Sequence, residues 1–319
     1  MRIGSGELAY EWNEHWVRVP ATQSGRENGR THAVAVAGNG DVIVFNQAQP
    51  GVLRFPPDGR LVNAWGDRFG GAHGMTLVVD PDGQEYLWLT DERSSEVVKT
   101  TTDGRTVLTI QRPDVPAYAA GRYVPTWVAV NEERFGGNGD VWVADGYGSN
   151  FVHRYRKDGG YVGSINGTEG RSGAFACPHA VAFDYRRGAP QLYVADRANR
   201  RVQVYDAEGK YVRAFGQDSL THPCMFAFEP GTGRLFIPEL FGWLAVVDAE
   251  DAFVGYVGAN EAVKPTDGWP RLPGWPNLPA DQIRPGHFNS PHGMTVAPNG
   301  DLYVVEWIVG GRITKLAKA

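Results

Sequence analysis

The sequence predicts an all-β protein, a six-bladed β-propeller built from short antiparallel strands. Three observations predict this fold. One segment recurs six times along the 319 residues, strand-like runs flank a turn in every copy, and glycine and proline are frequent without forming a low-complexity run. A repeat of roughly 40–50 residues that holds four short strands is the signature of a propeller blade.

Each copy of the repeat opens with two strand-like runs. A short apolar run is followed by a turn rich in Gly, Asn and Asp, and then by an alternating run such as "DVWVAD" or "QLYVAD". That order is typical of a strand, a hairpin turn and a second strand. The six copies are expected at residues 31–47, 72–92, 125–147, 178–197, 223–240 and 291–307.

Most copies continue with two more runs, such as "RVQVY" and, after another turn, "YVRAFG". The sixth copy has only a third run, residues 312–316, and lacks an outer strand. We expect residues 8–17 to supply this strand, so that the N-terminal strand closes the last blade and leaves no exposed edge. The sequence therefore predicts a single propeller domain over residues 1–319.

A long segment at about residues 260–289 interrupts the repeats. It is rich in Pro and Trp and has no strand periodicity, and loops of this length in compact folds are usually functional or disordered. We expect it to cover the mouth of the central channel that a propeller encloses. We also expect it to contribute Trp269 or Trp275 to a substrate pocket, because ligand pockets favour aromatic walls. Packing against the blade surface is the alternative. A shorter insert, residues 112–124, precedes the third copy.

Composition and charge narrow the class of partner. The net charge of −5, with no basic stripe, argues against nucleic acid. No apolar stretch is long enough to span a membrane, and no apolar signal region is visible at the N-terminus. Cys177 and Cys224 do not make a disulfide framework. We expect a cytoplasmic protein whose partner is a small-molecule substrate, not nucleic acid or membrane, and the sequence makes no prediction of oligomeric state.

Histidine recurs at one place in the repeat. The first strand of each blade lines the channel of a propeller, so the residue that starts it is expected to face the axis. Four of the six residues at this position are histidine, although the chain has eight histidines in all. The six, in chain order, are His32, His73, Thr126, His179, Cys224 and His292.

Three of these histidines have the spacing of a metal site. His73, His179 and His292 fall on alternate blades, about 120° apart in a sixfold ring, and three imidazoles that leave open positions are the arrangement of catalytic zinc sites. We predict Zn²⁺ or another divalent transition metal, since iron, manganese and copper also suit imidazole ligands. His32 is expected to be a fourth ligand or a base beside the metal. The alternative for each single histidine is a structural role, in which the side chain fills a polar channel and its hydrogen bonds are satisfied there.

The ends of the second strands are expected to form another ring close to the first. The Asp residues there are expected to bond to turn backbone, while Gln47 and Glu306 are expected to contact substrate. Tyr147 is a candidate general base if the charges of a metal and a guanidinium lower its pKa from about 10. Arg197 is expected to hold a carboxylate or to stabilise a tyrosinate. The alternative is that Arg197 pairs with an Asp and that Tyr147 packs.

The segments "HGMTLVVDPDGQEYLWLTD", "VWVADGYGSNFVHRY", "PHAVAFDYRRGAPQLYVADRANRRVQVY" and "SPHGMTVAPNGDLYV" resemble NHL-repeat propellers. Within these, they resemble the peptidyl-α-hydroxyglycine α-amidating lyases, the lyase domain of peptidylglycine α-amidating monooxygenase. The resemblance implies a six-bladed propeller with a catalytic zinc held by three histidines. On this basis His73, His179 and His292 are the zinc ligands. Tyr147 falls on the family's catalytic tyrosine in "DGY", and Arg197 falls on an active-site arginine in "ADR".

Four positions depart from the family pattern. Gln47 stands where the family has a catalytic arginine, and Ser290 replaces a methionine. Gly293 replaces an acidic residue that the family uses at a structural calcium, which makes a structural Ca²⁺ doubtful here. His32 stands where a small residue is expected. The resemblance thus implies that the scaffold and the metal ligands are retained, while the groups expected to contact substrate have changed.

We therefore predict a metal-dependent lyase for a small hydroxylated substrate of the α-hydroxyamide type, with the metal as a Lewis acid and Tyr147 as general base. A metal-dependent hydrolase of a lactone or amide is the first alternative, favoured by His32 and by the loss of the arginine. A non-catalytic NHL interaction module is the second alternative, because fold does not determine function.

Overall fold

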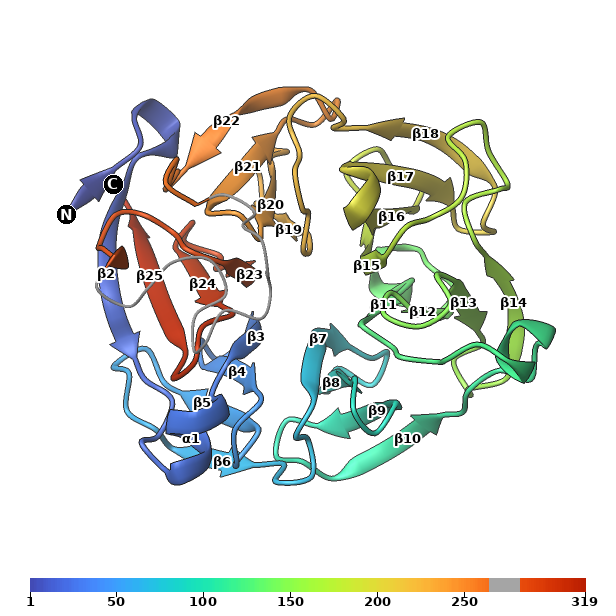
Figure 1. Ribbon diagram of the computed structural model, residues 1–319, viewed down its shortest axis with the longest axis horizontal. Coiled ribbons are helices and arrows are strands. Elements are labelled where there is room, and N and C mark those ends of the chain that lie inside the picture. Colours follow the sequence, from blue (N-terminus) through green and yellow to red (C-terminus); the bar gives the residue numbers. More distant parts are fainter. Residues whose placement is uncertain (264–281) are drawn as a thin grey trace. The chain divides into compact units, whose positions relative to one another are not determined.

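The computed structural model contains six antiparallel sheets, and it describes residues 1–263 and 282–319 (Figure 1). Five of the sheets have four strands that follow one another along the chain, while the sixth combines strands from the two ends of the chain. This is the architecture of a six-bladed β-propeller, and the predicted fold class is confirmed.

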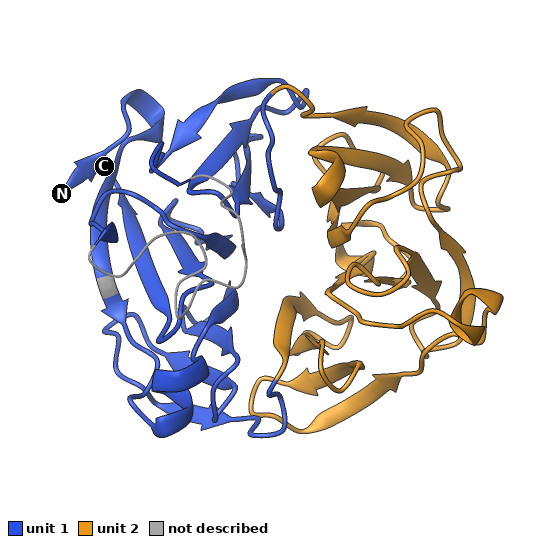
Figure 2. Cartoon of the chain, viewed as in Figure 1, with its two compact units in different colours: residues 1–70, 219–319 blue, residues 71–218 orange. Residues whose placement is uncertain are grey.

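Contacts within the chain divide it into two compact units (Figure 2). Unit 1 is made of Met1–Gly70 and Ser219–Ala319, and unit 2 is Gly71–Asp218. Each unit contains three of the six sheets. That the whole chain is a single domain stays a prediction.

Unit 1 holds the first, fifth and sixth blades. The first blade is β3 (Thr31–Val36), β4 (Val42–Asn46), β5 (Val52–Phe55) and β6 (Asn63–Trp65); the fifth is β19 (Ala227–Phe228), β20 (Leu235–Glu239), β21 (Trp243–Val247) and β22 (Phe253–Val257); the sixth is β23 (Pro291–Val296), β24 (Leu302–Glu306), β25 (Arg312–Lys318), β2 (Tyr10–Val17) and β1 (Arg2–Ile3). Its short helices are η1 (Gly6–Leu8) and α1 (Gln23–Asn28).

Unit 2 holds the second, third and fourth blades. The second blade is β7 (Ala72–Val79), β8 (Glu85–Asp91), β9 (Glu96–Thr101) and β10 (Thr106–Ile110); the third is β11 (Trp127–Val130), β12 (Val141–Ala144), β13 (Val152–Tyr155) and β14 (Tyr161–Ile165); the fourth is β15 (Pro178–Asp184), β16 (Gln191–Asp196), β17 (Arg201–Asp206) and β18 (Tyr211–Phe215). Three 3₁₀ turns accompany them, η2 (Pro116–Ala119), η3 (Glu133–Phe135) and η4 (Arg197–Asn199).

The N-terminal strand pairs with the last strand of the chain. β2 lies antiparallel to β25, with Tyr10 opposite Lys318 and Trp12 opposite Leu316. The predicted pairing of the N-terminal strand with the last strand is therefore confirmed for Tyr10–Val17, while closure of the propeller by this strand stays a prediction. β1 adds a further short strand outside β2, which the sequence did not predict.

The fifth blade has a much shorter inner strand than predicted. The sequence predicts a strand from residue 223, but β19 covers only Ala227–Phe228. The amide of Cys224 donates to the carbonyl oxygen of Pro238 in β20 at 2.9 Å, and a proline has no N–H with which to return the second bond of that ladder pair. The pairing therefore breaks at this point.

Neighbouring inner strands contact one another within each unit. In unit 2, β11 contacts both β7 and β15, and in unit 1, β3 contacts β23. Residues at the start of these strands are thereby brought close to residues of the next blade. Among the described residues, no helix is long and apolar enough to cross a membrane.

Candidate active site

All four histidines that start inner strands lie at irregularities of the strand pairing. In each case the register between the first and second strands shifts across the histidine. Such β-bulges release a residue from the ladder and redirect its side chain, and they are common beside active sites. The shifts fall between Thr31 and Ala33, Ala72 and Met75, Pro178 and Val181, and Pro291 and Gly293, and so enclose His32, His73, His179 and His292.

In unit 2, three of the predicted site residues surround the hydroxyl group of a fourth, Tyr147. The Tyr147 hydroxyl lies 3.2 Å from Nε2 of His73 and 3.1 Å from Nε2 of His179. Nη1 of Arg197 donates to the same oxygen at 3.0 Å. The two imidazole rings are 4.8 Å apart, centre to centre. The structure thus brings Tyr147 and Arg197 together with two of the three predicted metal ligands.

The hydrogen bond of His73 to the backbone determines which of its nitrogens carries the proton. Nδ1 lies 2.8 Å from the carbonyl oxygen of Thr126, which can only accept, so Nδ1 carries the proton and Nε2 presents a lone pair. Metal-binding histidines are commonly held in this way by a backbone carbonyl. Since the Tyr147 hydroxyl has one proton, it can donate to only one of the two imidazoles that face it.

Burial determines the charge states at this cluster. It lowers the pKa of His73 to about 3, and the positive charge of Arg197 acts in the same direction. His73 is therefore neutral near pH 7, the form that binds metals. Tyr147 is 37% exposed as a residue, but its hydroxyl faces His73 and His179, and desolvation there raises the pKa of the hydroxyl above its usual value. The charge of Arg197 acts in the opposite direction. Arg197 thus favours the ionised form of Tyr147, as expected, but desolvation raises the pKa of Tyr147 by more than Arg197 lowers it.

Unit 1 repeats the histidine arrangement with the other two histidines. Nδ1 of His292 donates to the carbonyl oxygen of His32 at 2.9 Å, as His73 does to Thr126. The rings of His32 and His292 lie 4.5 Å apart, and both side chains are buried. The structure therefore places His32 beside one of the predicted ligands, and its role stays a prediction.

A glycine follows the histidine where these bonds form, and the close approach of the inner strands requires it. A Cβ at Gly74 would lie 2.4 Å from the carbonyl oxygen of Thr126, and a Cβ at Gly293 would lie 2.3 Å from that of His32. Both distances are far below van der Waals contact. At residue 293 the sequence therefore meets a packing requirement and provides no carboxylate for a calcium ion.

The buried Asp residues at the ends of the second strands bind backbone amides. Asp91 accepts from the amide of Gly71 at 2.8 Å, and Asp196 accepts from that of Ala176 at 2.8 Å. Arg201 pairs with Asp196 at 2.7 Å. The prediction that these carboxylates hold turn backbone is confirmed.

Of the four residues predicted to contact substrate, two lie in the described part of the chain and are buried. Glu306 is fully buried; its carboxylate accepts from the amides of Asn289 and Ser290 at 2.6 and 3.0 Å and pairs with Arg312 at 3.2 Å. Gln47 is also buried, after the end of β4. Substrate contact by either side chain stays a prediction. Trp269 and Trp275 lie outside the described residues.

The sequence reasoning missed a buried hydrogen-bonded chain in the third blade. Tyr118, from the shorter insert, donates to Oδ2 of Asp145 at 2.7 Å and lies 2.6 Å from Nε2 of His153. Nδ1 of His153 lies 2.7 Å from Oγ of Ser164. Asp145 begins the turn that carries Tyr147, so this chain anchors the loop of the site. The available signal was a tyrosine in the insert together with a histidine in the third strand of the same blade.

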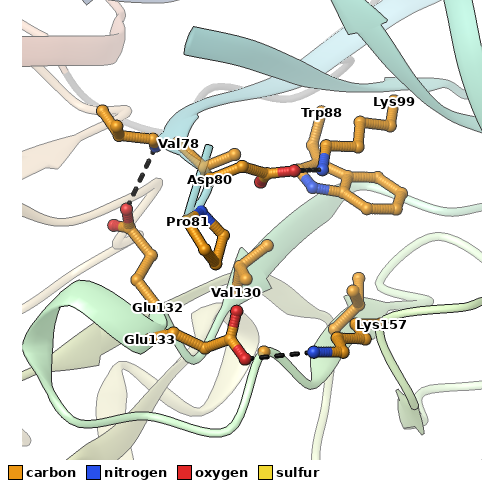
Figure 3. Close-up of a pocket in the computed structure, with 12 residues that line it drawn as sticks. Val78, Asp80, Pro81, Trp88, Lys99, Val130, Glu132, Glu133 and Lys157 are labelled. Atoms are coloured by element: carbon orange, nitrogen blue, oxygen red, sulfur yellow. Dashed lines mark hydrogen bonds and ion pairs between the residues drawn. The ribbon is translucent and has the colours of Figure 1, made fainter. Parts of the chain in front are cut away.

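A hollow of about 260 Å³ lies at the other end of β7 from His73 (Figure 3). Val78 and Trp88 are among the residues that line it, and each of its two lysines is paired with a carboxylate. Lys99 pairs with Asp80, and Lys157 pairs with Glu133 (Figure 3). Because these cations are neutralised within the hollow, we assign no ligand to it.

Comparison with known proteins confirms the predicted resemblance. No protein-family model matches the chain. It is 26% identical over 257 residues to peptidyl-α-hydroxyglycine α-amidating lyase 1 of Drosophila melanogaster, covering 76% of this chain and 39% of that protein. It is 28% identical over 200 residues to a probable peptidyl-α-hydroxyglycine α-amidating lyase of Caenorhabditis elegans, covering 60% and 49%. The chain therefore spans about half or less of these two relatives.

A third relative has no lyase in its name. The chain is 27% identical over 271 residues to NHL repeat-containing protein 3 of Homo sapiens, covering 79% of this chain and 73% of that protein. The curated relatives are thus amidating lyases and NHL-repeat proteins.

Solved structures with the same fold cover nearly the whole chain. A streptogramin B lyase matches with a TM-score of 0.64 at 13% identity, covering 99% of this chain and 100% of that one. A virginiamycin B lyase from Staphylococcus aureus matches with a TM-score of 0.59 at 11% identity, covering 97% and 99%. At these identities the likeness shows the propeller fold alone.

Proposed function

We propose that the chain is a metal-dependent lyase that acts on a small hydroxylated substrate of the α-hydroxyamide type. The observation that carries this proposal is the convergence of His73, His179 and Arg197 on the Tyr147 hydroxyl. A phenol surrounded by two imidazoles and a guanidinium has the composition of a proton-transfer site beside a cation site. The similarity to proteins named as amidating lyases supports the same reaction class.

His73, His179 and His292 are the residues proposed to hold the metal. Their donor set fits a zinc-like ion, because His73 and His292 each donate Nδ1–H to a backbone carbonyl and so direct Nε2 to a ligand. All three side chains are buried, and they start the inner strands of alternate blades. His32, beside His292, is proposed as a further ligand or base.

A divalent metal ion bound there would polarise a substrate oxygen and favour ionisation of the nearby phenol. Tyr147 would remove the proton of the substrate hydroxyl. The electron pair of that O–H bond would form the new carbonyl as the C–N bond breaks, and Tyr147 would return the proton to the departing nitrogen. Arg197, which donates to the Tyr147 oxygen at 3.0 Å, would stabilise the phenolate between these transfers.

Turnover of a panel of α-hydroxyamides, lactones and amides by metal-loaded protein tests this proposal. Replacing Tyr147 with Phe should slow the reaction by roughly 10²–10⁴-fold, the loss expected of a general base, and should leave metal content unchanged. Replacing the exposed Tyr256 with Phe is the control and should leave the rate unchanged.

The products distinguish the lyase from the hydrolase. In ¹⁸O-labelled water a lyase releases a carboxamide free of solvent oxygen, whereas a hydrolase releases a carboxylate that contains one solvent oxygen. A fully active Tyr147→Phe protein with labelled carboxylate product would overturn the lyase and establish the hydrolase.

A further inference from the structure

A second hollow of unit 2 borders the loop that carries Tyr147. Its volume is about 470 Å³, within the usual range for small-ligand sites, and its walls are the turn after β8, the end of β10 and the shorter insert. Oγ of Ser149 donates to the carbonyl oxygen of Arg122 at 2.9 Å, and the amide of Val124 donates to Asp145 at 2.6 Å. The wall of the hollow and the Tyr147 loop are thereby joined.

Three arginines line this hollow, and no ion pair within the described part of the chain neutralises their charges. Arg93, Arg112 and Arg122 are all exposed. Among residues 1–263 and 282–319, the guanidinium groups of Arg93 and Arg122 make no ion pair or hydrogen bond, and that of Arg112 only stacks 5.6 Å from the ring of Tyr118. This differs from the hollow in Figure 3, whose lysines are each paired with a carboxylate.

Two carboxylates in the same hollow limit the charge of its ligand. Glu92 and Glu96 line it beside the three arginines, so the lining carries one excess positive charge. A ligand group with a single negative charge would balance this excess. A phosphate dianion would carry more negative charge than the lining balances. The negative charge of Glu92 also acts on the Tyr147 hydroxyl, which places the hollow within electrostatic reach of the site.

We propose that this hollow is a subsite that binds a monocarboxylate group of the substrate, remote from the reacting carbon. Arg93 and Arg122 would hold the carboxylate in the forked geometry that guanidinium groups favour, and Glu92 and Glu96 would accept N–H donors next to it. The substrate would then be a small peptide-like acid. That the ligand is a substrate rests on the proposed function; that the hollow binds a carboxylate does not.

Direct binding tests the carboxylate site without turnover. N-acetylglycine and its uncharged amide form a matched pair of probes, and their dissociation constants can be measured by NMR titration. We expect the acid to bind the wild-type protein more tightly than the amide. The double variant Arg93→Gln/Arg122→Gln should weaken binding of the acid by roughly tenfold and leave the amide unchanged. The control is Arg60→Gln/Arg171→Gln, which removes the same charge from two other exposed arginines and should change neither constant.

Equal binding of the acid and the amide by the wild-type protein would overturn the proposal. So would tighter binding of inorganic phosphate than of N-acetylglycine, or an equal loss of affinity in the control variant. Turnover separates this proposal from the function on which it rests. If α-hydroxyamides with and without a carboxylate are converted equally well, the subsite is wrong and the lyase stands. In the opposite case, no α-hydroxyamide is converted, but the Arg93→Gln/Arg122→Gln variant binds N-acetylglycine more weakly and the control variant does not. The subsite then stands and the lyase is wrong.

Discussion

The carbonyl oxygen of Thr126 accepts a hydrogen bond from Nδ1 of His73 at 2.8 Å, across the contact between two inner strands. The same oxygen would lie 2.4 Å from a Cβ at Gly74. One backbone carbonyl therefore orients the histidine and excludes any side chain from the next residue. In the same way, the carbonyl oxygen of His32 accepts from Nδ1 of His292 at 2.9 Å and would lie 2.3 Å from a Cβ at Gly293.

Replacing Gly293 with Ala should destabilise the protein by about 1–3 kcal/mol, the cost of overpacking a well-packed contact. The added Cβ would lie 2.3 Å from the carbonyl oxygen of His32, and backbone must move to relieve the clash. The free energy of unfolding in urea measures this effect.

The matched control for this change is Gly163→Ala. Gly163 lies in β14, and a Cβ there would meet nothing within 4 Å. Its effect should be within about 0.5 kcal/mol of zero. Equal stability of the Gly293→Ala and Gly163→Ala proteins would show that the inner strands do not approach as closely as described.

Replacing Tyr118 with Phe should loosen the loop that carries Tyr147. Asp145 would lose one of its donors and Nε2 of His153 its partner, which should cost about 1–3 kcal/mol because both groups are buried. The amide of Ser149, which donates to Asp145 at 2.7 Å, should then exchange its hydrogen faster. Hydrogen exchange followed by mass spectrometry measures this change.

Tyr256→Phe is the control for that experiment, because Tyr256 is exposed and its hydroxyl donates to the carbonyl oxygen of Ser219 on the surface. Its stability should change by about 0.5 kcal/mol or less. Unchanged exchange at Ser149 in the Tyr118→Phe protein would mean that the buried chain does not hold the loop.

Acid should destabilise the protein through its buried neutral histidines. Burial lowers the pKa of His153 to about 3, so this residue stays neutral in the folded chain while the unfolded chain takes up a proton near pH 6.5. Below pH 6.5 the unfolded state therefore binds more protons, and stability falls as the pH drops toward 3. At pH 5 one such histidine should cost about 2 kcal/mol relative to pH 7.

The variant His153→Gln isolates this contribution, since glutamine does not titrate. Unfolding free energies at pH 7 and pH 5 should differ less for the variant than for the wild-type protein, by about 2 kcal/mol. The same pH dependence in both proteins would contradict a buried neutral imidazole at residue 153.

The fold was predictable because every blade repeats the same local signals. The turn in "GNGD" recurs at residues 38–41 and 137–140, and the glycine takes a positive φ of 88° and 80°. The candidate site residues could be singled out for a related reason, since histidine recurs at the first position of the repeat while the residues after the second strand differ. Tyr147 and Arg197 differ from their counterparts in other blades, and the structure joins them.

Contacts that depend on a single blade could not be predicted. Tyr118 lies in an insert without periodicity, and only the folded chain brings it to Asp145 and His153. The short β19 likewise follows from Pro238 on the neighbouring strand, a nonlocal effect that the run of apolar residues from 223 does not reveal. Repetition predicts what blades share, whereas their differences depend on packing between distant segments.

Metal content per chain tests the central claim most directly. Purified wild-type protein, dialysed and examined by plasma emission spectroscopy, should retain about one divalent transition-metal ion per chain. The separate variants His73→Ala, His179→Ala and His292→Ala should each lose that ion while circular dichroism shows an unchanged β-fold. A folded wild-type protein without stoichiometric metal after loading, or a His179→Ala protein with full occupancy, would contradict the account.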